Sequence, residues 1–97
     1  MLEAQIEKKV VQWASGKGIL SKKNIAGASV GWPDRLFIFP DGRHVWVEFK
    51  RQGGRLSKMQ EVVIKALRKN GVDVSVCFSV QEGLAYLEGF LDVKITE

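Results

Sequence analysis

The sequence has one cysteine, one histidine and two prolines in 97 residues, and it has no long apolar run. A single cysteine, Cys77, excludes an internal disulfide, and the apolar strand pattern around it indicates a buried, inert thiol. No stretch approaches the ~20 apolar residues of a membrane span. The polar and acidic start, residues 1–5, lacks the basic end and apolar core of a signal peptide. We therefore expect a cytoplasmic protein.

Length and composition predict one globular domain over residues 1–97. Hydrophobic residues make up 45% and charged residues 27% of the chain, which excludes a disordered or membrane protein. The charge is uneven: residues 1–71 carry fourteen Lys and Arg against six Asp and Glu, a net +8, whereas residues 72–97 carry one Lys against five acids, a net −4. The basic part favours a polyanionic partner such as nucleic acid.

A hairpin is predicted in the middle of the chain. Residues 45–50 alternate with period two, so three apolar side chains share one strand face, and Trp46, Glu48 and Lys50 share the other. The segment 40–42, Pro-Asp-Gly, suits a three-residue turn with glycine in the left-handed position. Counting back from that turn places Asp34 directly opposite Glu48, where Cβ atoms are about 5 Å apart.

This pair of acids predicts a metal site. Two carboxylates at that spacing repel each other unless one is protonated or a cation lies between them. A hard divalent cation with oxygen ligands, Mg²⁺ or Mn²⁺, resolves the repulsion. The prediction depends on the turn, because a two-residue Asp41-Gly42 turn would slip the register and move Asp34 to the other face.

The same residues resemble a known family. Asp34 followed by Glu48-x-Lys50 after a hairpin resembles the PD-(D/E)XK nuclease core. Together with the preceding Gly31-Trp32-Pro33, the run Arg55-Leu56-Ser57 and Gln60, the pattern is similar to the VRR-NUC branch, the virus-type replication-repair nucleases. The resemblance covers about residues 7–78. It implies an α/β fold, a mixed sheet flanked by helices in the order αβββαβ, with a further helix at the C-terminal end.

The resemblance also implies site residues. Asp34, Glu48 and the carbonyl of Phe49 would hold the metal. Glu7, on the first predicted helix, would lie near it, because the family places a glutamate there; a solvated helix charge is the other interpretation of Glu7. Lys50 would orient the attacking water or stabilise charge on the phosphate.

Gln60 has two competing interpretations. The resemblance makes it a site residue near Lys50. Its position three residues after Ser57 also fits a capping box at the start of a helix. We expect its side chain to serve one of these partners well at a time.

Basic residues near the pair are predicted to contact DNA. Arg51 and Arg55 flank two glycines that let the backbone approach phosphates closely. A flexible, solvated loop is the alternative. We also assign Lys22, Lys23 and Lys58 to the DNA-binding surface.

The remaining elements follow from periodicity and capping signals. Helices are predicted over residues 2–15, 58–69 and 80–91, and strands over 36–39, 43–50 and 72–78. A short strand at 19–25 would be interrupted by the polar residues 21–24. The helix at 80–91 is apolar around more of its surface than one core-facing stripe requires, so it either has a second core-facing side or meets another subunit.

These patterns lead to three functional hypotheses. The first is a metal-dependent endonuclease acting on DNA, with branched DNA such as four-way junctions as substrate. It would work as a homodimer, as stand-alone members of the family do, and a phage origin would fit the family. The second is a non-catalytic nucleic-acid-binding module in which Asp34 and Glu48 form salt bridges with Lys50 and Arg35. The third is a structural subunit that assembles through its last helix.

Overall fold

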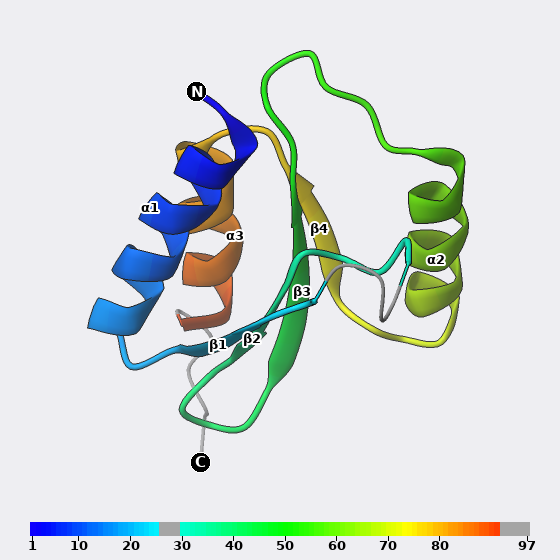
Figure 1. Ribbon diagram of the computed structural model, residues 1–97. Helices are drawn as coiled ribbons and strands as arrows, with labels where there is room; N and C mark the ends of the chain where they lie inside the picture. Colours follow the sequence, from blue (N-terminus) through cyan, green and yellow to red (C-terminus); the bar gives the residue numbers. More distant parts are fainter. Residues whose placement is uncertain (26–29, 92–97) are drawn as a thin grey trace.

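The computed structural model describes residues 1–25 and 30–91. Its elements follow the predicted order (Figure 1): α1 (Glu3–Gly16), β1 (Leu20–Lys23), β2 (Arg35–Ile38), β3 (His44–Phe49), α2 (Lys58–Lys69), β4 (Val74–Cys77) and α3 (Val80–Leu91). The mixed α+β architecture predicted from the sequence is therefore confirmed.

The four strands form one sheet in the order β1-β2-β3-β4. The first three run antiparallel, and β4 joins β3 in parallel through the crossover helix α2. The β2–β3 turn has three residues: the Phe39 N–H donates to the Arg43 carbonyl at 2.8 Å, and Gly42 has a φ of +89°. Leu36 consequently pairs with Trp46, the register that the sequence predicted.

Helices cover both faces of the sheet (Figure 1). On one face, α1 and α3 pack on the predicted apolar row, which includes Phe37, Val45 and Phe49. On the other face, a smaller apolar cluster joins α2 to Trp46 and β4. The site-bearing side of β3 therefore faces α2.

The first strand differs from its prediction. Residues 21–23, expected to interrupt a strand, lie inside β1. As an edge strand, β1 pairs only with β2 and leaves most of its side chains in water, so polar residues cost little there.

The apolar surface of α3 also has a structural explanation. Its partly buried Leu84, Tyr86, Phe90 and Leu91 pack around the same core as the fully buried Leu87. The helix lies against α1 so closely that a Cβ on Gly83 would approach Val10 Cγ2 to 2.7 Å. The second core-facing side is therefore the interpretation that the packing supports.

No helix within residues 1–25 and 30–91 combines the length and apolar character needed to cross a membrane.

Candidate active site

Asp34 and Glu48 approach each other across the β2–β3 hairpin. Arg35 pairs with Val47 in the β2–β3 register, so the adjacent residues Asp34 and Glu48 lie opposite each other. The backbone N–H of Phe49 donates to Asp34 Oδ2 at 2.8 Å, which fixes the orientation of this carboxylate. The structure thus brings together the two acids that the turn geometry predicted as neighbours.

Glu48 is almost completely enclosed, with 2% of its surface exposed. Its Oε1 is buried and has no hydrogen-bond partner. Burial, and next the nearby negative charge of Asp34, raise the pKa of Glu48 from 4.5 to about 7. Burial also raises the pKa of Asp34, against the lowering effect of the Phe49 hydrogen bond. Both shifts show two acids whose negative charge is incompletely compensated.

Lys50 and Gln60 approach the same oxygen of Glu48. The Nζ of Lys50 lies 3.7 Å from Glu48 Oε2, and the lysine side chain is only 13% exposed. The Nε2 of Gln60 donates to this Oε2 at 3.1 Å. Oε2 therefore has two nitrogen neighbours.

Gln60 fills both of its predicted roles at once. Its Oε1 accepts the Ser57 N–H at 2.8 Å, and its own N–H donates to Ser57 Oγ at 3.1 Å, which completes the capping box of α2. The amide nitrogen remains for Glu48. The expected competition between the roles was wrong, because the two ends of the amide group serve different partners.

Glu7 lies near enough to Asp34 for its negative charge to raise the pKa of that acid, but its carboxylate is engaged elsewhere. It is buried, and it accepts hydrogen bonds from Lys23 at 2.7 and 2.8 Å and from Arg35 at 2.9 Å. Arg35 pairs with Val47, whose side chain belongs to the core beneath α1, so this ion cluster lies on the other face of the sheet from Glu48. Neither carboxylate oxygen of Glu7 is left without a cationic partner.

Glu3, one turn before Glu7, is a second acidic residue of α1 near the pair. Its negative charge contributes to the raised pKa of Asp34 and of Glu48, although for Asp34 the effect of Glu7 is larger.

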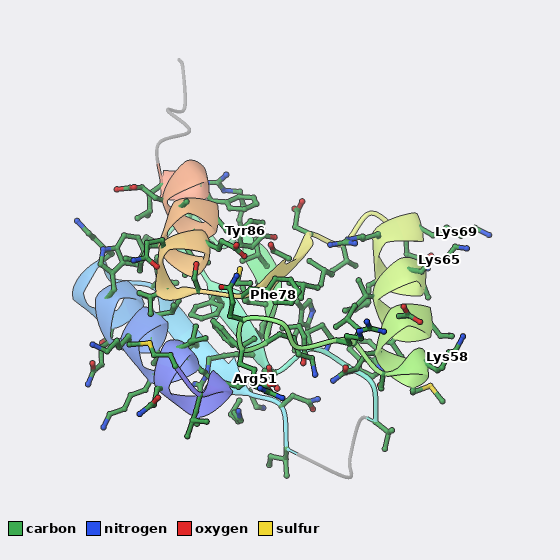
Figure 2. All side chains as sticks on the ribbon, turned by 90° about the horizontal axis from the view of Figure 1, so that it is seen from above. Arg51, Lys58, Lys65, Lys69, Phe78 and Tyr86 are labelled. Atoms are coloured by element: carbon green, nitrogen blue, oxygen red, sulfur yellow. The ribbon has the colours of Figure 1, made fainter. Side chains whose placement is uncertain are left out.

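The predicted DNA contacts divide into two groups. Arg51, Arg55, Lys58 and Lys22 are exposed, and the described part of the chain provides no ion-pair partner for any of them. Figure 2 shows Arg51 on the loop after β3 and Lys58 at the start of α2. Lys23 differs, because its ammonium group is paired with Glu7.

The acid pair suits a divalent cation. Glu48 Oε1 is a buried acceptor without a donor, and Asp34 adds a second carboxylate opposite it. Both are oxygen ligands of the kind that Mg²⁺ and Mn²⁺ take. Within the described residues, no three acidic, histidine or cysteine side chains cluster closely enough to hold a metal by themselves. A metal here would therefore complete its shell with backbone carbonyl, water or phosphate oxygens.

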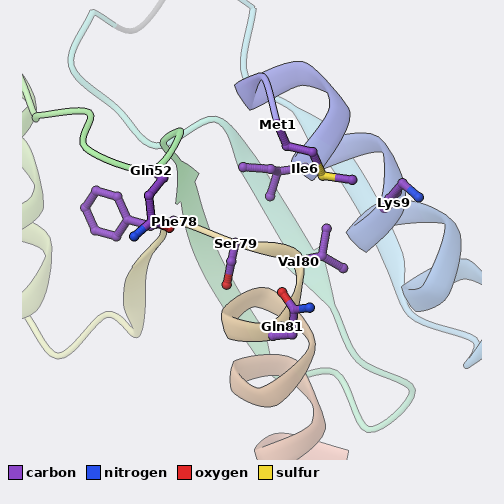
Figure 3. Close-up of a pocket in the computed structure, with 8 residues that line it drawn as sticks. All are labelled: Met1, Ile6, Lys9, Gln52, Phe78, Ser79, Val80 and Gln81. Atoms are coloured by element: carbon purple, nitrogen blue, oxygen red, sulfur yellow. The ribbon is translucent and has the colours of Figure 1, made fainter.

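A cavity of about 360 Å³ lies between α1, the loop after β3 and the start of α3 (Figure 3). Ile6, Phe78 and Val80 supply much of its wall, and Lys9 is the charged residue among those that line it. Because neither Asp34 nor Glu48 lines this cavity, we do not place the chemistry there.

Comparisons with known proteins identify the family and agree with the fold. Residues 3–81 match the family model of the VRR-NUC domain. A solved structure described as a VRR_NUC domain is 26% identical, covers 91% of this chain and 96% of its own, and superposes with a TM-score of 0.81. A second, described as a VRR_NUC domain protein, is 15% identical, covers 100% and 93%, and has a TM-score of 0.79, which shows the shared fold. No curated protein matches the sequence.

The family match spans the hairpin, its acid pair and the helix that carries Gln60, which are the parts that build the site. The chain therefore belongs to the VRR-NUC family of nuclease-type domains.

Proposed function

We propose that the protein is a metal-dependent endonuclease of the PD-(D/E)XK type that hydrolyses phosphodiester bonds in DNA. The observation that carries the proposal is Glu48: a carboxylate buried to 2% exposure, opposite a second acid, with one oxygen that has no donor. A buried carboxylate whose charge is only partly compensated is costly, and such groups occur mainly where function requires them.

Asp34, Glu48 and the carbonyl oxygen of Phe49 would hold Mg²⁺ or Mn²⁺, and Glu7 and Glu3 on α1 would add negative charge near them. When bound, the metal supplies a polarised phosphate and a water of lowered pKa. The Phe49 N–H fixes Asp34, and the Gln60 amide fixes Glu48, so both acids are oriented before the substrate arrives.

Lys50 completes the catalytic set. Its ammonium group is held beside Glu48 in a largely buried position, where a positive charge acts more strongly than in water. It would orient the attacking water and stabilise negative charge on the phosphate as the bond breaks.

The structure weakens the alternative of a binding module without catalysis. That hypothesis needs salt bridges from Lys50 and Arg35 to neutralise the two acids. Lys50 does form an ion pair with Glu48, at 3.7 Å, but Arg35 pairs with Glu7, and no ion pair of Asp34 is found among the described residues. A surface that only binds phosphates would gain nothing from the remaining negative charge.

We further propose branched DNA as the substrate and a two-fold homodimer as the active form. One chain carries one Asp34/Glu48 pair, so cutting two strands of a four-way junction in one binding event requires two chains. Closed two-fold pairing is the commonest assembly of small soluble proteins.

The test is a panel of labelled linear, flapped and four-way DNA incubated with Mg²⁺, Mn²⁺ or EDTA. We expect cleavage with either metal, none with EDTA, and faster cutting of the four-way junction. Glu48→Gln, which keeps the shape of the side chain, should abolish cleavage, whereas Glu61→Gln on the exposed side of α2 should leave it unchanged. Cleavage by Glu48→Gln at the wild-type rate would disprove the assignment.

A further inference from the structure

An apolar groove of about 400 Å³ lies between the Trp32 side chain and helix α2. Besides Trp32, the residues that line it are Val62, Val63, Ala66, Leu67 and Asn70. Its volume is within the range of small-molecule sites, roughly 300–1,000 Å³. We propose that this groove binds an unpaired nucleobase of the DNA, an inference that rests on the proposed nuclease function and adds a base-recognition site to it.

The groove belongs to an apolar surface that the fold leaves open. Trp32 is 41% exposed and Val62 62%, and beside them Met59 is 50% and Val30 67% exposed. Contiguous apolar side chains on the surface of a small protein mark a binding site. The fold itself therefore leaves this surface available for a ligand.

Trp32 is held in a defined orientation. Its ring meets Trp46 edge to face, with centroids 5.8 Å apart and planes at 67°. Gly31 sets the ring close to α2, because its φ of +84° and its contact with Met59 admit no side chain. A fixed indole with an exposed surface is the kind of platform on which unpaired bases stack.

The border of the groove carries positive charge. Lys58, Lys65 and Lys69 follow helical spacing around Val62, so they form one row along the outer edge of the groove. Figure 2 shows these three lysines projecting from α2 away from the sheet. All three are exposed, and no carboxylate of the described residues pairs with them. A flat apolar ring attached to phosphates matches an apolar groove with a cationic border.

The groove lies on the same side of the sheet as the acid pair, because Trp32 contacts Trp46, which shares a face of β3 with Glu48. Trp32 lies two residues before Asp34, and the helix that forms the groove's other wall carries the Gln60 that contacts Glu48. A nucleotide bound here would be near the bond to be cut. Bases in duplex DNA are stacked and paired, so the groove would accept a base only from a single strand, flap or branch point.

The experiment measures DNA binding in EDTA, where no cleavage can occur. A labelled single strand, the same strand with one abasic position, and a blunt duplex are titrated with the wild type, Trp32→Ala and Val62→Glu. Leu20→Glu is the matched control, because it adds the same charge at a site that is 68% exposed and lies on the distant edge strand. Thermal melting of each variant establishes that it is folded.

We expect both groove variants to weaken single-strand binding about tenfold, the effect of losing one base–aromatic stack. On the duplex, Val62→Glu should have the same effect as Leu20→Glu, and Trp32→Ala should bind as the wild type does. Trp32→Ala should bind the intact and abasic strands alike, because the base no longer has a partner.

Equal losses on single strand and duplex would overturn the inference. So would a change in molecular mass for Val62→Glu by light scattering, which would identify the groove as an interface between copies. Because binding is measured without metal, failure of cleavage would count against the proposed function and leave this inference standing.

Discussion

Gln60 shows how one side chain joins stability to the site. Its carbonyl oxygen caps α2 through the Ser57 N–H, while its amide nitrogen contacts Glu48. Loss of Gln60 therefore removes two unlike interactions, and Ser57 supplies a control for one of them. The Ser57 side chain takes part only in the cap, whereas its backbone N–H is kept in any substitution other than proline.

We predict that Gln60→Ala and Ser57→Ala each lower the free energy of unfolding by about 1 kcal/mol, the usual cost of a lost cap. Gln60→Ala alone should also reduce kcat by about tenfold, because the Glu48 carboxylate would no longer be oriented by the Gln60 amide. Urea unfolding and steady-state cleavage measure the two effects. A similar kcat for both variants would show that Gln60 acts only through the cap.

The buried acids give the metal-free protein a defined pH dependence. The pKa of Glu48 is raised from 4.5 to about 7 in the folded state, so between these values the folded protein keeps a proton that the unfolded chain has released. The unfolding free energy therefore falls as pH rises through this window and is level above it. Asp34, whose pKa is also raised, acts in the same direction.

In EDTA, we predict that the melting temperature falls between about pH 4.5 and pH 7 and that Glu48→Gln flattens much of this slope. The variant should be more stable than the wild type at pH 8, because it buries no charge. Mg²⁺ should raise the wild-type melting temperature at pH 8 and leave the variant unchanged. A wild-type melting temperature independent of pH would contradict the burial of an ionisable pair.

At the scale of elements, the sequence predicted the β2–β3 hairpin, but it predicted only part of how the helices contact the sheet. The Pro40–Gly42 turn fixes register locally, so the opposition of Asp34 and Glu48 followed from the sequence. The position of Glu7 relative to the acid pair depended on how α1 lies across the sheet, which is a tertiary property. The strand β1 was misjudged because an edge strand does not need apolar residues on both faces.

The loop from β3 to α2 has a testable electrostatic role. Arg51 and Arg55 are exposed beside Lys50. If each arginine contacts a phosphate, replacing both with alanine should weaken binding to all DNA sequences. It should also reduce the slope of the logarithm of the association constant against the logarithm of the salt concentration by about 2. Lys8 and Lys17 form a control pair of equal charge on α1 and its C-cap, where both are exposed and have no ion-pair partner among the described residues. An identical slope for both double variants would show that the loop arginines are merely solvated.

Gly31 and Gly53 offer a matched pair for the packing of α2. Both have positive φ, +84° and +80°, but a Cβ at Gly31 would lie 2.5 Å from Met59 Cγ and 2.9 Å from the Met59 carbonyl, whereas Gly53 faces open space. Gly53→Ala should lower the free energy of unfolding only through backbone strain, by about 1 kcal/mol. Gly31→Ala should lower the free energy of unfolding by about 2 kcal/mol more, because the new methyl group would displace α2 from its packed position. Equal unfolding free energies would mean that the loop moves freely over the helix.

At the scale of the whole molecule, the proposed dimer must form without α3, for which a subunit contact was one of two interpretations. Its apolar side chains are used within the chain, against α1 and the sheet. Light scattering at micromolar concentration should still give the mass of two chains if two strands of a junction are cut together. A monomer that nicks one strand at a time would refute the dimer and leave the chemistry of the single site intact.

The edge position of β1 has a consequence for solubility. An unpaired strand edge invites pairing with another chain and hence aggregation, and lysines are a common natural protection against it. Two lysines, Lys22 and Lys23, stand in this four-residue strand, beside the exposed Leu20. Lys22 would then both attract DNA and keep neighbouring copies from joining their sheets, so its replacement by valine should promote fibrillar association even when no nucleic acid is present.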